Sequence, residues 1–253
     1  MFFKSEGIVL RETEYKEADR LLTVLTKDHG LVTLKARGIS RSKSPLKGAC
    51  QLLTYSEFTW QDYRGKAAIT EAVSIEQFRE LRDDIELLSL GSYFAQAAEL
   101  LSQEDAPDPA LLSLLLNSLY ALGRLKKPQS LVKAAFELKA ACLAGFLPDL
   151  SGCAVCGNPA PDRLNVSHGV LQCAGCRTDA LDGIRLPVSA GTLAAMRYLI
   201  GCEDKKLFSF ALGEDTLREL NAVTETYLVT QLEHSFYTLD FYKSLFLTEN
   251  PYE

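Results

Sequence analysis

The chain has 253 residues, 47% of them hydrophobic, and a formal net charge of −6. This composition supports a sizeable core and excludes a disordered chain. The longest apolar stretch, residues 110–123, is interrupted by Ser and Asn and is too short to span a bilayer. The N-terminus lacks a signal-peptide pattern, so we expect a cytoplasmic protein whose thiols stay reduced.

The first 75 residues predict β-structure. They contain short runs rich in β-branched and aromatic residues, separated by turn signals. One such signal is the sequence DHG, whose Gly30 suits the left-handed position of a three-residue hairpin turn. Strands are expected at residues 7–15, 20–27, 31–37, 52–61 and 66–73. Five short strands favour a small barrel of the OB-fold type, and an SH3-like barrel fits the pattern nearly as well.

After residue 80 the apolar spacing becomes helical. Asp83 and Asp84 suit the N-terminus of the first helix, because a carboxylate there accepts hydrogen bonds from free backbone N–H groups. Helices are expected at residues 83–101, 107–125, 130–146, 189–201, 214–231 and 232–247. The sequence therefore predicts an α+β protein, with an OB-fold barrel in residues 1–80 and a helical domain in residues 81–253.

Charge is unevenly distributed along the chain. Residues 1–66 carry a net charge of +4, and the remainder carries −10. The window from His29 to Ser56 contains no Asp or Glu. Its basic residues near the predicted third strand and beyond are Lys35, Arg37, Arg41, Lys43 and Lys47. Such a window indicates either contact with a polyanion or an ordinary solvated surface.

Two CxxC pairs stand between the helical stretches. They are Cys153 with Cys156 and Cys173 with Cys176. Two residues between cysteines allow a tight turn to aim both sulfurs at one ion, and Gly157 and Gly175 are expected to ease these turns. Four thiolates complete a tetrahedron, so the spacing predicts one structural Zn²⁺ in a zinc-ribbon-like insertion at residues 150–182. A disulfide is disfavoured by the compartment, and a redox role lacks the βαβ context.

The remaining cysteines and histidines are expected to be structural. We expect Cys50, Cys142 and Cys202 to be small buried hydrophobes and His168 to be a solvated loop residue. His29 lies in the predicted hairpin and His234 stands alone. The chain contains none of the common phosphate-binding or hydrolase motifs, so no catalytic residues and no enzyme activity are predicted.

The segment GIVLRETEYKEADRLLTVLTKDHGLVTLKARGISRSKS resembles the N-terminal region of the bacterial RecO family of DNA repair and recombination proteins. The similarity includes the opening Gly7 to Leu10, the group from Tyr15 to Arg20, the hairpin ending at Gly30 and the basic loop after it. The later helical region with an inserted four-cysteine knuckle is similar to the family too. Some relatives lack the four cysteines, which implies that zinc serves as scaffold.

The resemblance implies a recombination mediator associated with the bacterial nucleoid. Such a mediator binds single- and double-stranded DNA, anneals complementary strands and helps load the RecA recombinase in the RecF pathway. The implied partners are RecR and the acidic C-terminal tail of the single-strand DNA-binding protein. For the tail, Lys133, Lys139 and Arg197 are candidate cations, although their segments also suit ordinary amphipathic helices.

With this resemblance, the carboxylate-free window becomes the predicted DNA site. Its five cations attract phosphates, and neighbouring serine hydroxyls add donors. We expect it to form a flexible polar loop that contributes little to the core. Tyr55, Phe58 and Trp60 either stack on bases or fill the barrel. Two other hypotheses stay open: a zinc-ribbon adaptor that binds proteins and no DNA, and an enzyme whose site is scattered along the chain.

Overall fold

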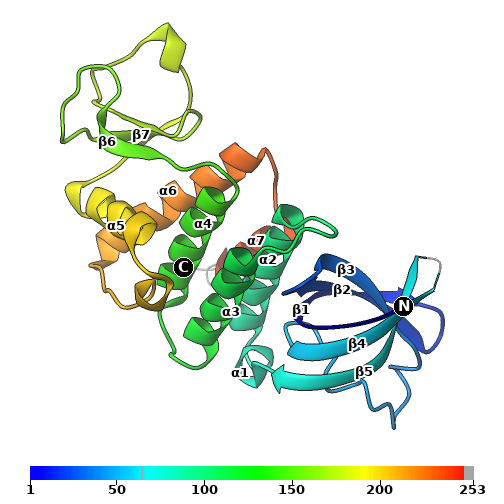
Figure 1. The fold of residues 1–253 in the computed structure, drawn as a ribbon. Helices are drawn as coiled ribbons and strands as arrows, with labels where there is room; N and C mark the ends of the chain where they lie inside the picture. Colours follow the sequence, from blue (N-terminus) through cyan, green and yellow to red (C-terminus); the bar gives the residue numbers. More distant parts are fainter. Residues whose placement is uncertain (64, 248–253) are drawn as a thin grey trace. The chain divides into compact units, whose positions relative to one another are not determined.

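The computed structural model describes residues 1–63 and 65–247 (Figure 1). Its N-terminal part is a closed five-stranded barrel with strand order β1-β2-β3-β5-β4, in which β4 returns to pair with β1. This Greek-key order confirms the predicted OB-fold. The strands are β1 (Phe2–Tyr15), β2 (Asp19–Thr26), β3 (Gly30–Ala36), β4 (Tyr55–Tyr63) and β5 (Lys66–Glu76).

The predicted hairpin joins β2 to β3. Gly30 has φ of 63°, and the Thr26 hydroxyl accepts from the His29 N–H and donates to the Gly30 carbonyl. A Cβ at Gly30 would lie 2.6 Å from the carbonyl oxygens of Gln103 and Ala106. Glycine is therefore required there by both its backbone angle and its close packing.

The aromatic side chains of β4 belong to the barrel core. Phe58 is fully buried and Trp60 nearly so. The rings of Phe3 and Trp60 stack at 5.6 Å, and the edge of His29 packs against Trp60 at 5.3 Å. Tyr55 is half-buried, and its hydroxyl donates to a carboxylate of β1. Of the two interpretations of these aromatics, core packing is correct for Phe58 and Trp60, because alternate residues of a strand face the same side.

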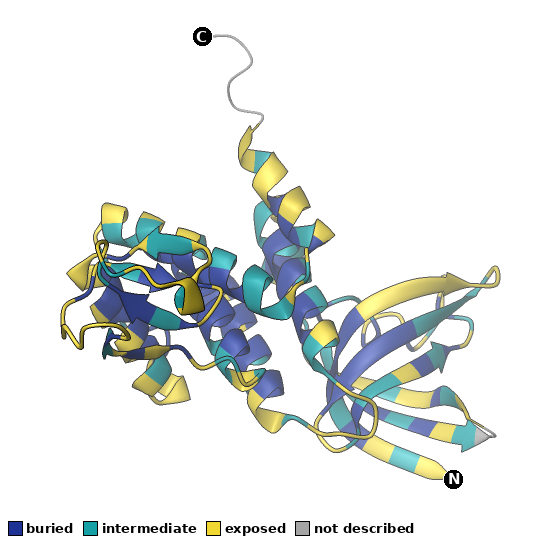
Figure 2. Ribbon diagram, turned by 90° about the horizontal axis from the view of Figure 1, so that it is seen from above, coloured by how far each residue is buried: buried dark blue, intermediate teal, exposed yellow. Residues whose placement is uncertain are grey.

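Helices complete the first of two compact units, which comprises residues 1–124 and the C-terminal segment from residue 236. The expected acidic cap of the first long helix is confirmed for Asp84, which accepts from two N–H groups of α2. Asp108 caps α3 in the same way and accepts from one N–H group. Helix α7 carries many exposed residues, drawn yellow in Figure 2, and packs on α2. The helices are α1 (Arg79–Arg82), α2 (Ile85–Leu101), α3 (Pro109–Gly123) and α7 (Tyr237–Leu247).

The second unit, residues 125–235, combines three helices with a small sheet. The helices are α4 (Gln129–Leu143), α5 (Ala190–Gly201) and α6 (Glu214–Leu232). The sheet has the order β6-β8-β7-β9, from β6 (Asp149–Cys153), β7 (Arg163–Asn165), β8 (Val170–Gln172) and β9 (Arg185–Pro187). The predicted domain boundary at residue 80 falls inside the first unit. The division into an OB-fold domain and a helical domain at this residue stays a prediction.

A buried ion cluster links α4 to α6. Lys133 is only 4% exposed, and its ammonium lies 2.8 Å from both Glu137 and Glu225. The fully buried Glu137 also accepts from the Thr224 hydroxyl at 2.9 Å. Lys133 was a candidate cation for an acidic tail, and this is wrong because its charge is enclosed between two helices and already paired. Among the described residues, no helix is long and apolar enough to cross a bilayer.

The cluster generates a stability prediction. In Lys133→Met the carboxylate of Glu137 stays buried without its cation, so we expect a loss of about 3–5 kcal/mol in the free energy of unfolding. Replacing Glu137 as well, in Lys133→Met with Glu137→Leu, removes the fully buried charge and should restore most of the loss, because the remaining Glu225 side chain is 24% exposed to solvent. Urea unfolding followed by circular dichroism measures the difference. A single variant as stable as the parent would contradict the assigned role of this pair.

The carboxyl group of Glu137 also determines how the stability loss of Lys133→Met depends on pH. Burial raises the pKa of Glu137 above its ordinary value, and the nearby Lys133 opposes this rise. Removing Lys133 raises the pKa further. A carboxyl whose pKa is higher in the folded state than in the unfolded state costs stability above both values, and this cost declines as the pH falls toward the unfolded value. The deficit of Lys133→Met is therefore expected to shrink as the pH falls from neutral toward the ordinary carboxyl value of 4.5.

Candidate nucleic-acid interface and metal centre

The β3–β4 segment, residues 37–54, contains most of the predicted DNA site. It is a series of tight turns rather than an extended loop. Gly38 begins the series with φ of 63°, where a side chain would be strained. Successive backbone hydrogen bonds run from Arg41 to Gly38, from Ser44 to Arg41, and from Lys47 to Ser44. The segment is thus locally ordered by its own backbone.

Apolar side chains anchor this segment to the barrel. Ile39, Leu46 and Cys50 are at most 8% exposed and belong to the same core cluster as Phe58. Burial raises the pKa of the Cys50 thiol to about 12, so this cysteine is an unreactive small hydrophobe, as expected. The prediction of a flexible polar loop with little part in the core is wrong. The sequence signal for this anchoring was the apolar residues Ile39, Leu46 and Cys50, which alternate with the cations.

Most of the predicted DNA-binding cations lie on the outside of the segment. Arg37, Arg41, Lys43 and Lys47 are exposed. Within residues 1–63 and 65–247, none of them forms an ion pair with a carboxylate. These cations are free to meet an external anion, and their role in DNA binding stays a prediction.

Lys35 differs from the other four. Its ammonium lies 2.9 Å from the Asp19 carboxylate and 4.7 Å from the centre of the Tyr15 ring. Asp19 also accepts the Gly38 N–H at 2.8 Å. The hydrogen bonds from Gly38 and Lys35 hold the pKa of Asp19 below its ordinary value. Lys35 therefore helps to position the start of the segment, and its charge is partly neutralised.

A cavity of about 370 Å³ opens beside the segment. Its lining includes Ser40 and Lys47 of the segment, Arg20 of β2 and Glu12 of β1. Arg20 also pairs with Glu14 at 3.2 Å. Arg20 is a cation next to the predicted site that sequence reasoning missed, because it stands before the window in a carboxylate-rich stretch.

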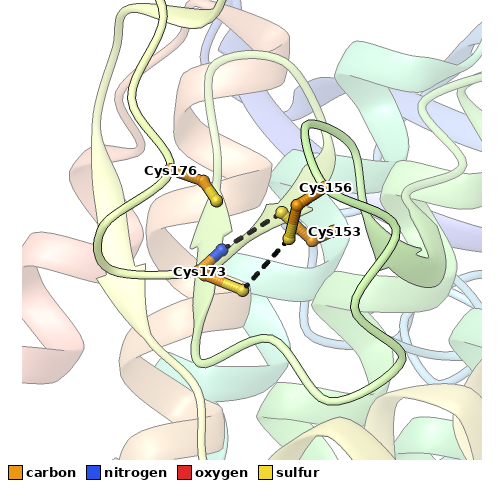
Figure 3. Close-up of side chains that lie close together, drawn as sticks. All are labelled: Cys153, Cys156, Cys173 and Cys176. Carbon is orange, nitrogen blue, oxygen red and sulfur yellow. Dashed lines mark hydrogen bonds between the residues drawn. The ribbon is translucent and has the colours of Figure 1, made fainter.

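The two CxxC pairs form a second candidate site, in the sheet of the second unit (Figure 3). The four sulfurs lie within 4.8 Å of one another. In the first turn the Gly157 N–H donates to the Cys153 carbonyl, and Gly157 has φ of 72°. The second turn has a hydrogen bond from Cys176 to Cys173, and its Gly175 does not adopt a positive φ. The prediction that glycine eases the turn is therefore confirmed for the first turn alone.

The sulfur positions fit a tetrahedral metal–thiolate centre. Metal–sulfur bonds of about 2.3 Å give a tetrahedron with edges of about 3.8 Å. The Cys156 and Cys173 sulfurs are 3.8 Å apart. Burial opposes ionisation of Cys153, but N–H groups of Cys156, Val155 and Cys173 lower its pKa to about 6. The cluster can hold a metal ion.

Without a cation, ionisation of one thiol in the cluster opposes ionisation of its neighbours. The hydrogen bond with Cys156, burial and the charge of Cys153 raise the pKa of Cys176 to about 12. Four thiolates so close together require a positive ion to offset their mutual repulsion. The Asn158 side-chain amide donates a hydrogen bond to the Cys173 sulfur at 3.2 Å, which stabilises the thiolate form of Cys173.

The chain matches two family descriptions over most of its length. Residues 1–78 match Recombination protein O N terminal, and residues 82–240 match Recombination protein O C terminal. The chain belongs to the RecO family of DNA repair proteins. It is 32% identical over 246 residues to DNA repair protein RecO of Acetivibrio thermocellus, covering 96% of this chain and 97% of that protein. It is 37% identical over 202 residues to DNA repair protein RecO of Rubrobacter xylanophilus, covering 78% and 80%.

The other predicted structural residues of this RecO-family chain have local explanations. His168 is exposed in a loop, and its Nε2 lies 2.8 Å from the Asp182 carbonyl oxygen. Cys142 and Cys202 are half-buried rather than buried. Burial raises the pKa of Cys142 to about 11. Neither cysteine belongs to the four-sulfur cluster.

The cluster predicts a metal content that can be measured. We expect about one metal ion per purified chain, since four thiolates complete one coordination shell. Cys173→Ser removes one ligand and should lose the ion, with faster proteolysis of residues 149–187. Cys202→Ser is the matched control and should keep it. Wild-type protein purified without chelators that contains no metal, with all four thiols freely titratable, would contradict the assignment.

Proposed function

We propose that this RecO-family chain is a non-enzymatic recombination mediator that binds single- and double-stranded DNA through the β3–β4 segment. In this role it anneals complementary strands and helps to load the RecA recombinase onto DNA coated by the single-strand DNA-binding protein. The observation that carries the proposal is a group of four exposed cations without carboxylate partners, in a region free of Asp and Glu. Phosphates are the anions that such a surface attracts most strongly.

Binding through this segment is mainly electrostatic and tolerant of sequence. The cations and the hydroxyls of Ser40 and Ser42 are suited to phosphate oxygens, and these contacts carry no base information. Phe58 and Trp60 are buried, so they are not available as stacking platforms. Sequence-tolerant binding suits a mediator, which must act wherever single strands arise. We also propose association with the nucleoid, as an outcome of this DNA binding.

We propose Zn²⁺ as the metal of the four-cysteine cluster. Zinc favours four thiolates in a tetrahedron, and a closed shell leaves no position for a substrate. The ion would hold the two turns together, with Cys153, Cys156, Cys173 and Cys176 as ligands. Its role is structural and not catalytic.

The proposed protein partners are RecR and the acidic C-terminal tail of the single-strand DNA-binding protein. For the tail, the candidate cations Lys139 and Arg197 already have internal partners. Lys139 donates to the carbonyls of Ile200 and Cys202, and Arg197 donates to the Leu150 carbonyl at 3.0 Å. Both residues hold elements of the second unit together, so the tail surface is assigned to neither of them.

The DNA site is tested by removing three cations together. Arg37→Ala, Arg41→Ala and Lys43→Ala should flatten the log–log salt dependence of single-strand binding by about 2, since each phosphate contact contributes about 0.7. All oligonucleotides should be weakened alike, and strand annealing should fall in parallel. Fluorescence anisotropy over a salt series measures the binding. The single tryptophan, Trp60, is buried in the barrel and reports whether the variant is folded.

The control removes three exposed cations of the second unit, in Lys205→Ala, Lys206→Ala and Arg218→Ala. It lowers the net charge equally and should leave the slope unchanged. A folded loop variant with wild-type affinity and slope would show that the β3–β4 segment is not the DNA site. Retained partner binding with no DNA binding in any variant would favour the protein-adaptor hypothesis.

The tail proposal has its own measurement. A synthetic peptide with the acidic, apolar C-terminal sequence of the partner should bind the full chain with micromolar affinity by calorimetry. Binding should weaken with salt, because the tail carries several carboxylates. If the isolated peptide does not bind at micromolar concentration, the single-strand DNA-binding protein is recruited in another way.

A further inference from the structure

A polar cavity lies beside the second cysteine turn, and none of the four cysteines lines it. Its volume is about 230 Å³. Three arginines line it, Arg163, Arg177 and Arg185, together with Thr178 and Asp182. The second unit carries 11 Lys and Arg against 12 Asp and Glu, so this cavity gathers three of its basic residues in one place. Neither the proposed DNA site nor the metal centre uses them as ligands.

The sheet register explains why two of the arginines meet. Strand β7 pairs with β9 so that Asn165 lies opposite Arg185 and Arg163 lies opposite Pro187. Successive side chains of a strand alternate between faces, so Arg163 and Arg185 share one face. Leu164 occupies the other face and is fully buried. The third arginine follows the second cysteine turn directly in sequence.

The guanidinium groups retain donors for a ligand. Arg185 donates to the carbonyls of Cys176 at 3.2 Å and Ala174 at 3.5 Å, which orients it. Arg163 donates to the Asp162 carbonyl at 2.8 Å, and its guanidinium pairs with the Asp162 carboxylate at 3.4 Å. Arg177 is exposed and makes no hydrogen bond or ion pair with a residue that the structure describes. A guanidinium has more N–H donors than these contacts use.

The charge of the lining favours an anion. Asp182 is the one carboxylate among the residues that line the cavity, and it accepts the Gly183 N–H at 3.0 Å. The lining alone has a net charge of +2, and the Asp162 carboxylate that pairs with Arg163 reduces the local charge to +1. Leu181 is the apolar side chain of the lining, so the cavity offers little surface to the apolar residues that anchor an acidic peptide. A forked guanidinium matches a phosphate with two parallel hydrogen bonds.

We propose that this arginine cavity binds a backbone phosphate of a nucleic-acid strand. The second unit then has its own nucleic-acid contact, separate from the β3–β4 segment. The choice of nucleic acid as the source of the phosphate rests on the proposed function. Arg163 and Arg177 are the ligand-binding residues, and Arg185 positions the second cysteine turn through the carbonyls that it contacts.

Two contact regions in one chain have a consequence for affinity. A strand bound at one region is held near the other, so the second contact forms at a raised effective concentration. An oligonucleotide that reaches both regions should therefore bind more tightly than the sum of two separate contacts suggests. This provides a physical basis for holding nucleic acid on a protein that is acidic overall.

The test uses the full chain with its metal. Arg163→Ala with Arg177→Ala should reduce the magnitude of the log–log salt slope for a labelled single-stranded oligonucleotide by about 1.4, from two contacts of about 0.7 each. The matched control Arg218→Ala removes an exposed arginine of the same unit, one that is already paired with Glu214 and Asp215. It should leave the slope unchanged. Metal content should stay at the wild-type value in both variants.

The same measurement in the Arg37→Ala, Arg41→Ala and Lys43→Ala background separates this inference from the proposed function. If the loop variant flattens the slope and the cavity variant does not, the DNA site of the barrel holds and the cavity proposal is overturned. If the cavity variant alone flattens the slope, the cavity proposal holds and the barrel site falls. If the wild-type chain does not bind DNA, both fall.

Two further results would overturn the cavity proposal. Loss of metal from the Arg163→Ala and Arg177→Ala variant would show that these arginines serve the thiolate cluster. Binding of an Asp-rich peptide to the wild-type chain but not to this variant, with an unchanged DNA slope, would assign the cavity to a protein ligand. Photo-crosslinking of an oligonucleotide containing 4-thiothymidine to the peptide spanning residues 163–187 would support the proposal directly.

Discussion

Burial of Ile39, Leu46 and Cys50 in the barrel is the interaction on which the candidate DNA site depends. The β3–β4 segment is long, and a free segment of this length has many conformations that binding would have to restrict. Burying an aliphatic side chain contributes about 1.5–3 kcal/mol, and this opposes part of that entropy during folding. The cations between these anchors are therefore presented from an ordered backbone, before any ligand arrives.

The same arrangement explains how an acidic protein can offer a basic surface. The carboxylates nearest the segment belong to β1 and β2, and each has a partner. Glu12 accepts the Leu52 N–H, Glu14 pairs with Arg20, and Asp19 accepts from Gly38 and Lys35. Their charges are compensated locally. At physiological ionic strength, exposed charges more than about 8 Å apart are largely screened from each other. The potential at the segment therefore depends more on nearby charges than on the net charge of the helices.

The sequence predicted the elements that local chemistry decides. The Gly30 hairpin, the Asp84 cap and the two cysteine turns each depend on residues that are close in the chain, and each was found. Long-range packing decides the remainder. Lys133 looks like a surface cation on an amphipathic helix, and only the approach of α6 shows that it is enclosed. Arg163 and Arg185 carry no motif, and only the pairing of the short strands β7 and β9 brings them to one cavity.

The metal centre and the helices of the second unit depend on each other through backbone contacts. The sheet has short strands and a small core, in which Leu150, Leu164 and Leu171 are the main buried side chains. So small a core needs additional stabilisation, which an ion held by the four cysteines would supply. Helices support the same sheet from outside, since Arg197 donates to the Leu150 carbonyl and Gln231 donates to the Val166 carbonyl at 2.6 Å. Neither of these hydrogen bonds involves a cysteine, so they do not depend on a bound ion. Loss of the ion should therefore loosen the cysteine turns first, while the sheet stays attached to the helices at Leu150 and Val166.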